Sequence, residues 1–420
     1  MRKIIASLII GAAVLGVCSL ALSGAARKGN DDLYRQVGLF SDTLVIVQSD
    51  YVDEISPKDL IYGALKGMLS SLDPHSQFMD PEDYNELKVE TEGKFGGIGI
   101  ELTLKDGLLT VVTPIEDTPA WKAGIKANDR IVKINNELTR DMTLNDAVKK
   151  MRGAPREAVT LTIFRESQNK ILEFKLVRDI IRIKDIKEAK VLEGDIGYIR
   201  LVEFREDTSR DFSTALKKLR EQKISGLILD LRNNPGGLLD AAVKVTQNFV
   251  EKGKLIVSTK GRKSSQEMQF LSQESSPVLD LPVIVLINEG SASGSEIVAA
   301  ALQDYKRAII LGTKSFGKGS VQSVIPLKDG SALRLTTSKY FTPLGHEIHG
   351  LGVVPDIAVE EAKIEPLAES QEISAKAQEV FQGLEEKKDE PRQEKVQDFK
   401  SDNQLMRAVD ILKAFKIYHK

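Results

Sequence analysis

The sequence predicts a chain of mixed helix and sheet. We expect an α/β core, a mostly β domain with two helices inserted before it, and helical segments at both ends. Apolar strand patterns alternate with amphipathic helix patterns between about residues 197 and 302, as in α/β cores. Glycine-rich turns and alternating strand patterns fill residues 93–178. Helical periodicity marks residues 27–92 and returns near the C-terminus.

The composition is that of an ordinary globular protein with several domains. A chain of 420 residues is long enough for two or three domains, each with its own core. The 59 Lys and Arg residues nearly balance the 61 Asp and Glu residues, so no general attraction to nucleic acid is expected. The one cysteine, Cys18, lies in the N-terminal apolar segment, which leaves the folded part without disulfide or thiol chemistry.

Residues 1–26 have the pattern of a targeting segment, because a short basic start precedes an apolar run that ends in small residues. The run fits a signal peptide cleaved near Ala25 or Ala26. It also fits an uncleaved anchor, since it approaches the ~20 residues that span a bilayer. A lipoprotein acylated at Cys18 ranks last, because the small residue usual before such a cysteine is missing. All three readings place the folded body outside the cytoplasm, in a periplasm or cell envelope.

The region 27–92 is expected to be helical, with amphipathic runs at residues 42–51 and 57–69. His75 follows them, and with Asp73 and Ser76 it suggests a nucleophilic triad. The dipeptide Asp-Pro in the same segment is a turn signal, so we expect a turn here and no catalytic role for His75.

The inserted domain, residues 93–178, begins with a glycine-rich loop that feeds a strand. Its segment Thr118–Asn136 resembles the pattern S-P-A-x-x-A-G-L-x-x-G-D-x-I of PDZ domains. A helix is expected at Leu144–Met151 and a closing strand at Val159–Arg165. The resemblance implies capture of a peptide C-terminus, with loop amides on the carboxylate and a strand edge that adds the peptide as an extra strand. A nucleotide loop is disfavoured, because no strand–loop–helix unit surrounds the glycines.

Candidate peptide-binding residues follow from this resemblance. Loop glycines offer amides, and four apolar side chains are expected to line a pocket for the last residue, with ordinary core as an equal alternative. The arginine at the helix end is the candidate for coupling the domain to the rest of the chain, with a surface arginine as the alternative. The predicted set is Gly96, Gly97, Ile98, Gly99, Ile100, Val148, Met151 and Arg152.

The segment 179–360 has the pattern of the α/β core. Its strands and helices are expected at Gly197–Leu201, Thr208–Glu221, Gly226–Leu231, Asp240–Val250, Pro282–Ile287 and Thr336–Thr342. The third of these is followed by a loop containing Gly236 and Gly237, whose lack of side chains allows the backbone to approach a substrate closely.

A serine lies where the strand Pro282–Ile287 turns into a helix. Ser293 and Glu296 fit the S-x-x-E capping box, and taken alone this segment favours a plain helix cap, because caps are common and catalytic serines are rare. The unpaired N–H groups at a helix start also suit a developing negative charge. A glycine-rich loop that carries Lys314 and Lys318 follows.

Two motifs here resemble those of the carboxyl-terminal processing proteases, also called tail-specific proteases. Residues 288–296 match N-x-G-S-A-S-x-S-E, and residues 317–322 match G-K-G-x-x-Q at the spacing found in the family. The resemblance extends over roughly residues 31–360. It implies an α/β protease core with an inserted PDZ domain, and peptide hydrolysis through an acyl-enzyme. Ser293 is then the nucleophile, Lys318 the base, and Gln322 a residue that holds the lysine amine.

The oxyanion donors are assigned to two backbone amides, one from Gly294 and one from either Gly236 or Gly237. Rivals remain for the other roles, and only the resemblance decides against them. They are Ser291 and Ser295 as nucleophiles and Lys314 as base.

The predicted function is an extracytoplasmic serine endopeptidase that recognises protein C-termini through its PDZ domain. A non-catalytic PDZ scaffold of the cell envelope is the alternative. No cofactor is expected. His346 and His349 are three residues apart but lack the helical H-E-x-x-H pattern, so no metal is expected either.

The region 361–420 is expected to be a charged linker followed by a helix at residues 402–418, which we expect to dock on another subunit. The expected partners are protein substrates, a second copy of the chain through the terminal helices, and a membrane if the N-terminal segment is retained.

Overall fold

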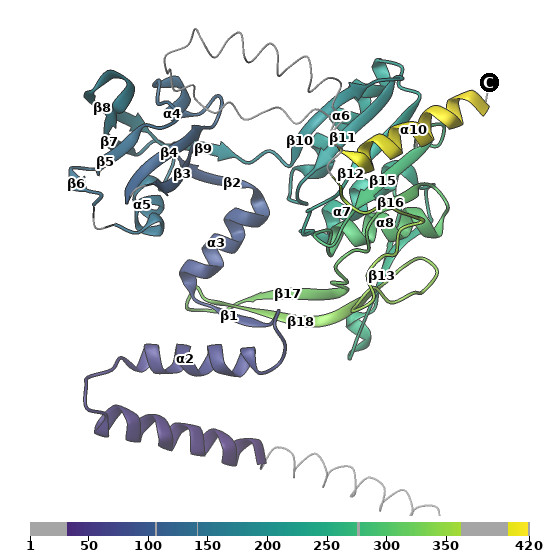
Figure 1. Cartoon of the computed structure of the whole chain (residues 1–420). Helices are drawn as coiled ribbons and strands as arrows, with labels where there is room; N and C mark the ends of the chain where they lie inside the picture. Colours follow the sequence, from purple (N-terminus) through teal and green to yellow (C-terminus); the bar gives the residue numbers. More distant parts are fainter. Residues whose placement is uncertain (1–31, 106, 141, 275–277, 363–401, 419–420) are drawn as a thin grey trace, which may run out of the picture. The chain divides into compact units, whose positions relative to one another are not determined.

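The structure is a computed structural model and describes residues 32–105, 107–140, 142–274, 278–362 and 402–418 (Figure 1). The predicted targeting segment and residues 363–401 of the predicted linker lie outside the described residues. No helix within the described ranges is long and apolar enough to cross a membrane.

The smaller of two compact units contains the described residues up to Pro81 together with Val324–Leu335. Its elements are a helix over residues 32–50, α2 (Pro57–Ser70) and β1 (Gln77–Met79). β1 pairs antiparallel with the start of β18 (Ala332–Phe341). The region is helical as expected, apart from the short strand β1, which the sequence did not indicate.

A turn at Asp73 ends the helical run before this strand. The Asp73 carboxylate accepts hydrogen bonds from the backbone N–H groups of His75 (2.7 Å) and Ser76 (2.9 Å), and from the Ser76 hydroxyl (2.7 Å). The side chain thus acts as a local acceptor, as is typical of Asp in turns. The chain stops being helical after α2 because of this turn, and the three residues that suggested a triad form it.

The second unit contains the inserted domain, an antiparallel sheet with strand order β3-β4-β5-β7-β8 and β6 paired beside β5 (Figure 1). Alternate side chains of β7, including Leu161 and Ile163, are buried in its core. The strand that was expected to close the domain is followed by a further one, β8, which pairs with β7. The elements are β3 (Ile100–Lys105), β4 (Leu108–Pro114), α4 (Pro119–Lys122), β5 (Arg130–Ile134), β6 (Glu137–Leu138), α5 (Leu144–Met151), β7 (Ala158–Arg165), a 3-10 turn (Glu166–Gln168) and β8 (Lys170–Val177).

A two-stranded ribbon lies between the inserted domain and the core. β2 (Lys94–Gly97) follows α3 (Pro81–Glu92) and pairs antiparallel with β9 (Asp179–Arg182). The boundary expected after residue 178 therefore falls directly before a strand that pairs with β2.

The α/β core contains a six-stranded sheet ordered β10-β11-β12-β15-β16-β19. Its strands from β11 to β19 are parallel, and β10 is antiparallel to β11. The elements are β10 (Ile186–Leu192), β11 (Ile196–Leu201), α6 (Thr208–Glu221), β12 (Gly226–Asp230), α7 (Leu239–Thr246), a 3-10 turn (Gln247–Phe249), β15 (Val283–Ile287), α8 (Gly294–Asp304), β16 (Ile309–Gly312), β19 (Ile357–Ala358) and α10 (Asn403–Tyr418). The α/β prediction is confirmed.

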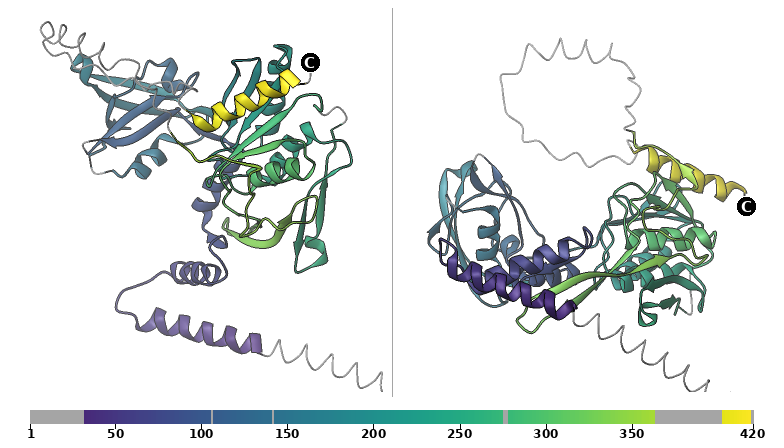
Figure 2. Two further views of the ribbon diagram at one scale, coloured as in Figure 1. Left: turned by 45° about the vertical axis from the view of Figure 1, so that its right-hand side comes forward. Right: turned by 90° about the horizontal axis from the view of Figure 1, so that it is seen from below.

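Helices cover both faces of this sheet (Figures 1 and 2). Successive side chains of a strand point to opposite faces. On β12, Leu227 and Leu229 therefore pack with α6, α7 and α8, whereas Ile228 packs with α10. α10 buries its apolar side, including Leu405 and Leu412, against the sheet of its own chain. The expectation that this helix docks on another subunit is wrong for that side.

A second sheet completes the core. β13 (Leu255–Gly261) pairs with β14 (Met268–Leu271) and with the far end of β18, and a 3-10 turn lies at Ser264–Gln266. β17 (Ser320–Pro326) also pairs with β18.

Candidate active site

Ser293 lies in a sharp turn between β15 and α8. Its backbone has φ 51° and ψ −109°, a sparsely populated conformation that costs roughly 1–3 kcal/mol. The residue is 8% exposed, so it is buried but retains a small solvent-accessible area. Gly294 begins α8, and its N–H therefore has no acceptor within the helix. A hydroxyl and the amide of a helix start thus lie next to each other.

The two neighbouring serines make structural hydrogen bonds instead, and both are 0% exposed. The Ser291 hydroxyl donates to Leu231 O (2.8 Å) and accepts from Asn288 N (3.0 Å). The Ser295 hydroxyl donates to Asn234 O (2.9 Å). These bonds fix the serine turn to the loop after β12, and they leave neither hydroxyl exposed to a substrate.

Glu296 is fully buried and connects the serine turn with the lysine loop. Its Oε2 accepts hydrogen bonds from the backbone N–H groups of Ser293 and Lys318, each at 2.8 Å. Its Oε1 accepts from the Ser315 hydroxyl (2.5 Å) and from the Gly317 N–H (2.6 Å). A buried carboxylate needs such donors to offset its lost hydration. The backbones of Ser293 and Lys318 therefore meet at one oxygen atom.

The residues of the lysine loop differ in exposure and anchoring. Lys318 is half-buried, whereas Lys314 is exposed. Gln322, on β17, donates its side-chain amide to the hydroxyls of Ser320 (2.8 Å) and Thr336 (3.4 Å). Its side-chain position is thus fixed by two hydroxyl groups.

The loop after β12 approaches the serine turn so closely that only glycine fits. A Cβ atom on Gly236 would lie 2.7 Å from both Gly294 N and Ser293 Cβ. The Gly236 N–H donates to Asn234 Oδ1 (2.9 Å). Of the two loop amides predicted to face an oxyanion, that of Gly236 is therefore engaged, and Gly237 is the remaining candidate.

Tyr340, on β18, is buried beside Ser293 and was not predicted from the sequence. Burial raises the pKa of its phenol to about 12, and a hydrogen bond with Ser293 opposes that rise. The hydroxyl therefore stays neutral at ordinary pH and acts as a hydrogen-bonding neighbour of the serine.

The apolar residues predicted for peptide binding divide into two groups. Ile98 and Met151 are buried in the core of the inserted domain. Ile100 and Val148 keep partial exposure. The strand order places β3 at one edge of its sheet, and this strand begins at Ile100. An exposed backbone edge is therefore present next to the two partly exposed side chains.

The predicted glycines of that domain are tightly packed. Gly96 O accepts from Gly153 N (3.1 Å), and a Cβ on Gly96 would lie 2.0 Å from Gly153 O. Gly97 is paired with β9. Gly99 has φ 77°, and a Cβ there would lie 2.3 Å from the Thr118 side chain. The loop backbone is thus held in one conformation.

Arg152 lies at the C-terminal end of α5. Its guanidinium carbon is 4.7 Å from the centroid of the Phe95 ring, a cation–π contact with strand β2. The residue before Phe95, Lys94, forms an ion pair with Asp207 (2.7 Å) in the α/β core.

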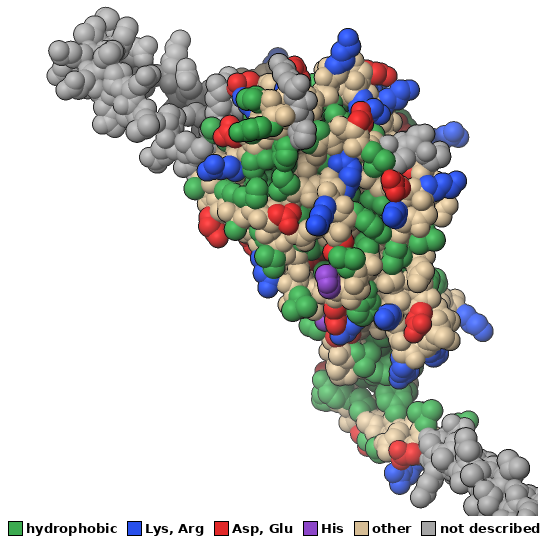
Figure 3. All heavy atoms as spheres, turned by 90° about the vertical axis from the view of Figure 1, so that its right-hand side faces the viewer, with side chains coloured by type: hydrophobic (Ala, Val, Ile, Leu, Met, Phe, Trp, Pro, Cys, Tyr) green, Lys and Arg blue, Asp and Glu red, His purple; other side chains and the backbone are tan. Residues whose placement is uncertain are grey.

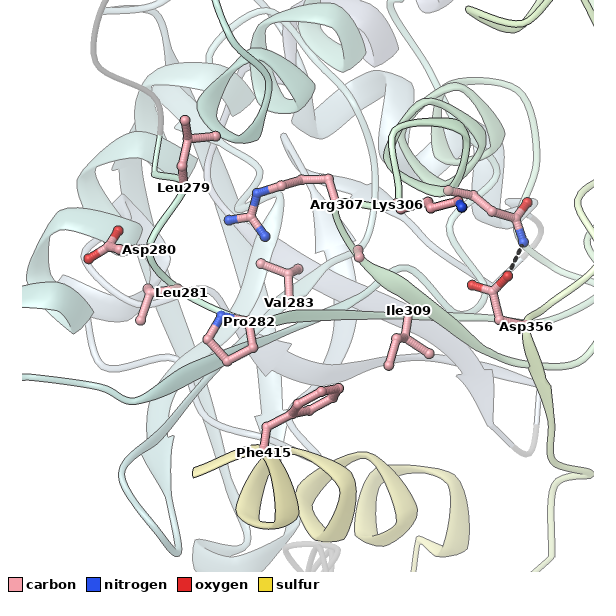
Figure 4. A pocket seen from close by; sticks show the side chains of 12 residues that line it. Leu279, Asp280, Leu281, Pro282, Val283, Lys306, Arg307, Ile309, Asp356 and Phe415 are labelled. Atoms are coloured by element: carbon pink, nitrogen blue, oxygen red, sulfur yellow. Dashed lines mark hydrogen bonds between the residues drawn. The ribbon is translucent and has the colours of Figure 1, made fainter. Parts of the chain in front are cut away.

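A cavity of about 550 Å³ lies at the other end of the α/β sheet (Figure 4). Val283 and Ile309, at the amino ends of β15 and β16, line it together with Phe415 of α10. Ser293 and the lysine loop instead follow the carboxyl ends of strands. The cavity is therefore separate from the serine site.

On the face shown in Figure 3, acidic and basic side chains are interspersed, and no large patch of one charge is visible. Within the part of the chain that the structure describes, no group of three or more His, Cys, Asp or Glu side chains is arranged to hold a metal.

Three regions match known protein families. Residues 195–359 match Peptidase family S41, residues 110–165 match the PDZ domain, and residues 21–83 match the N-terminal domain of the activating protease CtpB. With the buried serine turn and the α/β core, these matches define the class of the protein as a serine peptidase that carries a PDZ domain.

Individual relatives narrow this class. The chain is 47% identical over 366 residues to the carboxy-terminal-processing protease of Bartonella bacilliformis, covering 86% of this chain and 83% of that protein. It is 36% identical over 366 residues to a probable CtpA-like serine protease of Staphylococcus epidermidis, covering 87% and 74%. The solved photosystem II D1 C-terminal processing protease is 30% identical, with a TM-score of 0.45 and coverage of 77% and 92%. The chain belongs to the carboxy-terminal-processing protease family.

Proposed function

We propose that this peptidase works by a serine/lysine mechanism, with Ser293 as nucleophile and Lys318 as general base. The observation that supports this most is the pair of hydrogen bonds from the Ser293 and Lys318 backbones to one oxygen of Glu296. The burial of Ser291 and Ser295 and the exposure of Lys314 also favour these two residues over their rivals.

The chemistry follows from this assignment. The neutral Lys318 amine takes the proton of the Ser293 hydroxyl as Oγ bonds to the carbonyl carbon of the peptide. The carbon–nitrogen bond then breaks, and the lysine returns the proton to the leaving amine. A water molecule, deprotonated in the same way, hydrolyses the acyl-enzyme and restores Ser293. Gln322 supports the lysine through its side-chain oxygen, because its amide nitrogen is held by two hydroxyls.

The negative oxygen of the tetrahedral intermediate needs donors that are already in place. Gly294 N at the start of α8 is one candidate, and Gly237 N is the other. Gly236 serves instead as a spacer, since its N–H is bonded to Asn234 and its missing side chain makes room for the turn.

We also propose that the PDZ domain selects substrates by their C-terminal end. The edge strand β3 is suited to add an extended peptide by backbone hydrogen bonds, and the loop at Gly96–Gly99 is suited to hold its carboxylate. Ile100 and Val148 are the partly exposed apolar side chains beside this edge, which favours an apolar last residue, while Ile98 and Met151 support them from the core.

Arg152 is the proposed link between peptide binding and the protease core. Its contact with Phe95 joins the end of α5 to the ribbon, whose Lys94 is paired with Asp207. A peptide that shifts α5 would alter this contact, and a ligand influences a switch only through such differences.

We further propose that the protein is exported, that it is attached to a membrane if its N-terminal segment is retained, and that it pairs with a second copy. The N-terminal sequence favours action outside the cytoplasm. The helix over residues 32–50 exposes large apolar side chains, including Leu33, Val37 and Phe40, which favours pairing with a second copy.

Cleavage of unfolded casein tests the catalytic assignment. Ser293→Ala and Lys318→Ala are expected to abolish cleavage while the melting temperature stays within a few degrees of wild type. Lys314→Ala is the matched control and should keep most activity. Full activity in Lys318→Ala together with a loss in Lys314→Ala would reverse the base assignment. Full activity in Ser293→Ala would show that another residue is the nucleophile, and absence of cleavage by the wild type would favour the non-catalytic scaffold.

Peptide substrates with a free or an amidated C-terminus test recognition. Amidation should raise KM, because it removes the carboxylate from the loop amides. Arg152→Ala should lower kcat for every substrate, whereas Arg156→Ala, an exposed arginine four residues away, should not. Equal rates for all peptides would contradict selection by the PDZ domain, and equal rates for both arginine variants would contradict the coupling.

A further inference from the structure

Arg232 follows β12 and is only 9% exposed, yet each of its five N–H groups has an acceptor. Nε donates to Asp230 Oδ1 (3.0 Å), and Nη2 donates to Asp230 Oδ2 and Asp402 Oδ2, both at 2.7 Å. Nη1 donates to Asp402 Oδ1 (3.0 Å) and Gln404 Oε1 (2.9 Å). The guanidinium is therefore fully satisfied, which is the condition for burying it.

Three of these five acceptor contacts come from the C-terminal helix region. Asp402 and Gln404 are about 170 residues away from Arg232 in sequence, at the start of α10. Asp402 also accepts from Leu405 N (3.0 Å), so it caps the helix as well. If α10 moves away, three buried N–H groups lose their partners.

The position of Arg232 connects this helix with the catalytic loop. The next residues are Asn233 and Asn234. The backbone N–H of Asn233 donates to Asn288 Oδ1 (2.8 Å), and Asn288 Nδ2 donates to Asn233 Oδ1 (3.0 Å). The carbonyl of Asn234 accepts from Ala292 N (3.0 Å) and from the Ser295 hydroxyl (2.9 Å), the residues on either side of the Ser293–Gly294 pair.

The Asn234 side chain extends the same connection to the glycines. Its Nδ2 donates to Leu201 O (2.9 Å) and its Oδ1 accepts from Gly236 N (2.9 Å). The loop that sets the distance between Gly237 and the serine turn is therefore fixed at one end by Arg232.

We propose that Asp402 is a positioning residue for peptide hydrolysis: it fixes Arg232, and through Arg232 it fixes the loop Asn233–Gly237 against the Ser293 turn. Docking of α10 thus completes the oxyanion site. The inference rests on the proposed role of Ser293.

Asp402→Asn tests this in the full-length protein. Asparagine caps a helix as well as aspartate does, so α10 keeps its cap while the ion pair with Arg232 is lost. We expect kcat on a peptide with a free apolar C-terminus to fall about tenfold, because small misplacements of a catalytic group are costly, with KM nearly unchanged. The affinity for a peptide aldehyde, which needs the oxyanion donors, should fall by a similar factor. Asp402→Glu, which keeps the charge, should recover part of the loss.

Lys413→Ala is the control, because it removes an ion pair of α10 with Glu193 (2.8 Å) that is remote from Arg232. Its kcat should match wild type. A lower melting temperature for Asp402→Asn with unchanged kcat and aldehyde affinity overturns the proposal, since a purely structural contact has that effect.

If Asp402→Asn fails to fold, Gln404→Leu repeats the test by removing one acceptor of Nη1. Labelling of Ser293 by a fluorophosphonate is measured in parallel: absent labelling in wild type refutes the proposed function, whereas normal labelling with equal kcat refutes only the role of Asp402.

Discussion

The Ser293 turn and the Gly96–Gly99 loop both depend on glycine, but they are held in different ways. Buried side chains fix the serine turn, with Glu296 accepting four hydrogen bonds and Asn234 joining the neighbouring loop. The Gly96–Gly99 loop is held mainly by backbone contacts, such as Gly153 N to Gly96 O, and it leads into an edge strand.

This difference fits the different tasks of the two regions. A reacting hydroxyl and its oxyanion donors must be in place before the transition state forms, so buried polar contacts preorganise them. A peptide-binding edge must keep backbone groups available for an incoming strand. Disturbing the serine turn or the loop packed against it should therefore affect catalysis most, and disturbing the backbone of the Gly96–Gly99 loop should affect recognition.

The largest effect is expected for Glu296→Gln. The amide keeps one acceptor oxygen but places an NH₂ group against two of the four donors. We expect kcat to fall at least about a hundredfold, and the free energy of unfolding to fall by about 1–3 kcal/mol. Glu289→Gln is the matched control on the same turn, because that side chain is exposed. Equal kcat in both variants, measured on casein, would show that Glu296 is not needed for the active geometry.

Gly236→Ala is expected to have the next largest effect. Its Cβ would lie 2.7 Å from Gly294 N, so the loop must move away from the serine turn and kcat should fall about tenfold or more. Gly253 also has positive φ (83°), but a Cβ there meets nothing within 4 Å. Gly253→Ala is therefore the control, because it adds the strain of an alanine at positive φ without a steric clash. If both variants lose only stability and keep kcat, close packing at Gly236 has no catalytic role.

A matched pair in the PDZ domain should show the opposite kinetic pattern. Gly99 (φ 77°) and Gly107 (φ 73°) have similar backbones, but only a Cβ on Gly99 meets a neighbour, Thr118, at 2.3 Å. Gly99→Ala should raise KM for peptides with a free C-terminus by about tenfold, equivalent to roughly 1.4 kcal/mol of binding, and leave their kcat largely unchanged. If Gly107→Ala raised KM as much as Gly99→Ala does, backbone strain rather than the shape of the Gly96–Gly99 loop would be the cause of the weaker binding.

The smallest effect is expected for Tyr340→Phe and concerns alkaline pH. Burial raises the pKa of Tyr340 to about 12, above the value of about 10 in an unfolded chain. The stability that it contributes is complete below about pH 10 and is lost as the pH rises to about 12. The melting temperature of Tyr340→Phe should therefore fall less steeply than that of wild type over this range. Parallel curves would show that the buried hydroxyl does not contribute to the alkaline loss.

Much of the fold follows from local sequence patterns. The continuous apolar runs of β12 and β15 and the helices between them predict the α/β core, because a strand buried on both faces requires such a run. The PDZ helix at Leu144–Met151 is confirmed to the residue. β1 and β8 were missed, because a three-residue strand and a final strand depend on distant pairing partners.

The candidate site was predictable only where its residues belong to motifs. Ser293 and Lys318 do, and Glu296 was noticed only as a cap because its other donors follow about 20 residues later. Tyr340 and Asp402 carry no local signal, and nothing near Arg232 in the sequence indicates Asp402 as its partner. Their contacts form through the fold and leave no pattern in a single sequence.

The most direct test of the central claim is the rate at which a fluorophosphonate labels Ser293. Only an activated serine reacts quickly with such a reagent, so the rate reports the base independently of substrate binding. Wild type and Lys314→Ala should label at the same rate, with the adduct on Ser293 by mass spectrometry, and Lys318→Ala should label at least about a hundredfold more slowly. Labelling of Lys318→Ala at the wild-type rate, or an adduct on Ser291 or Ser295, would contradict the account.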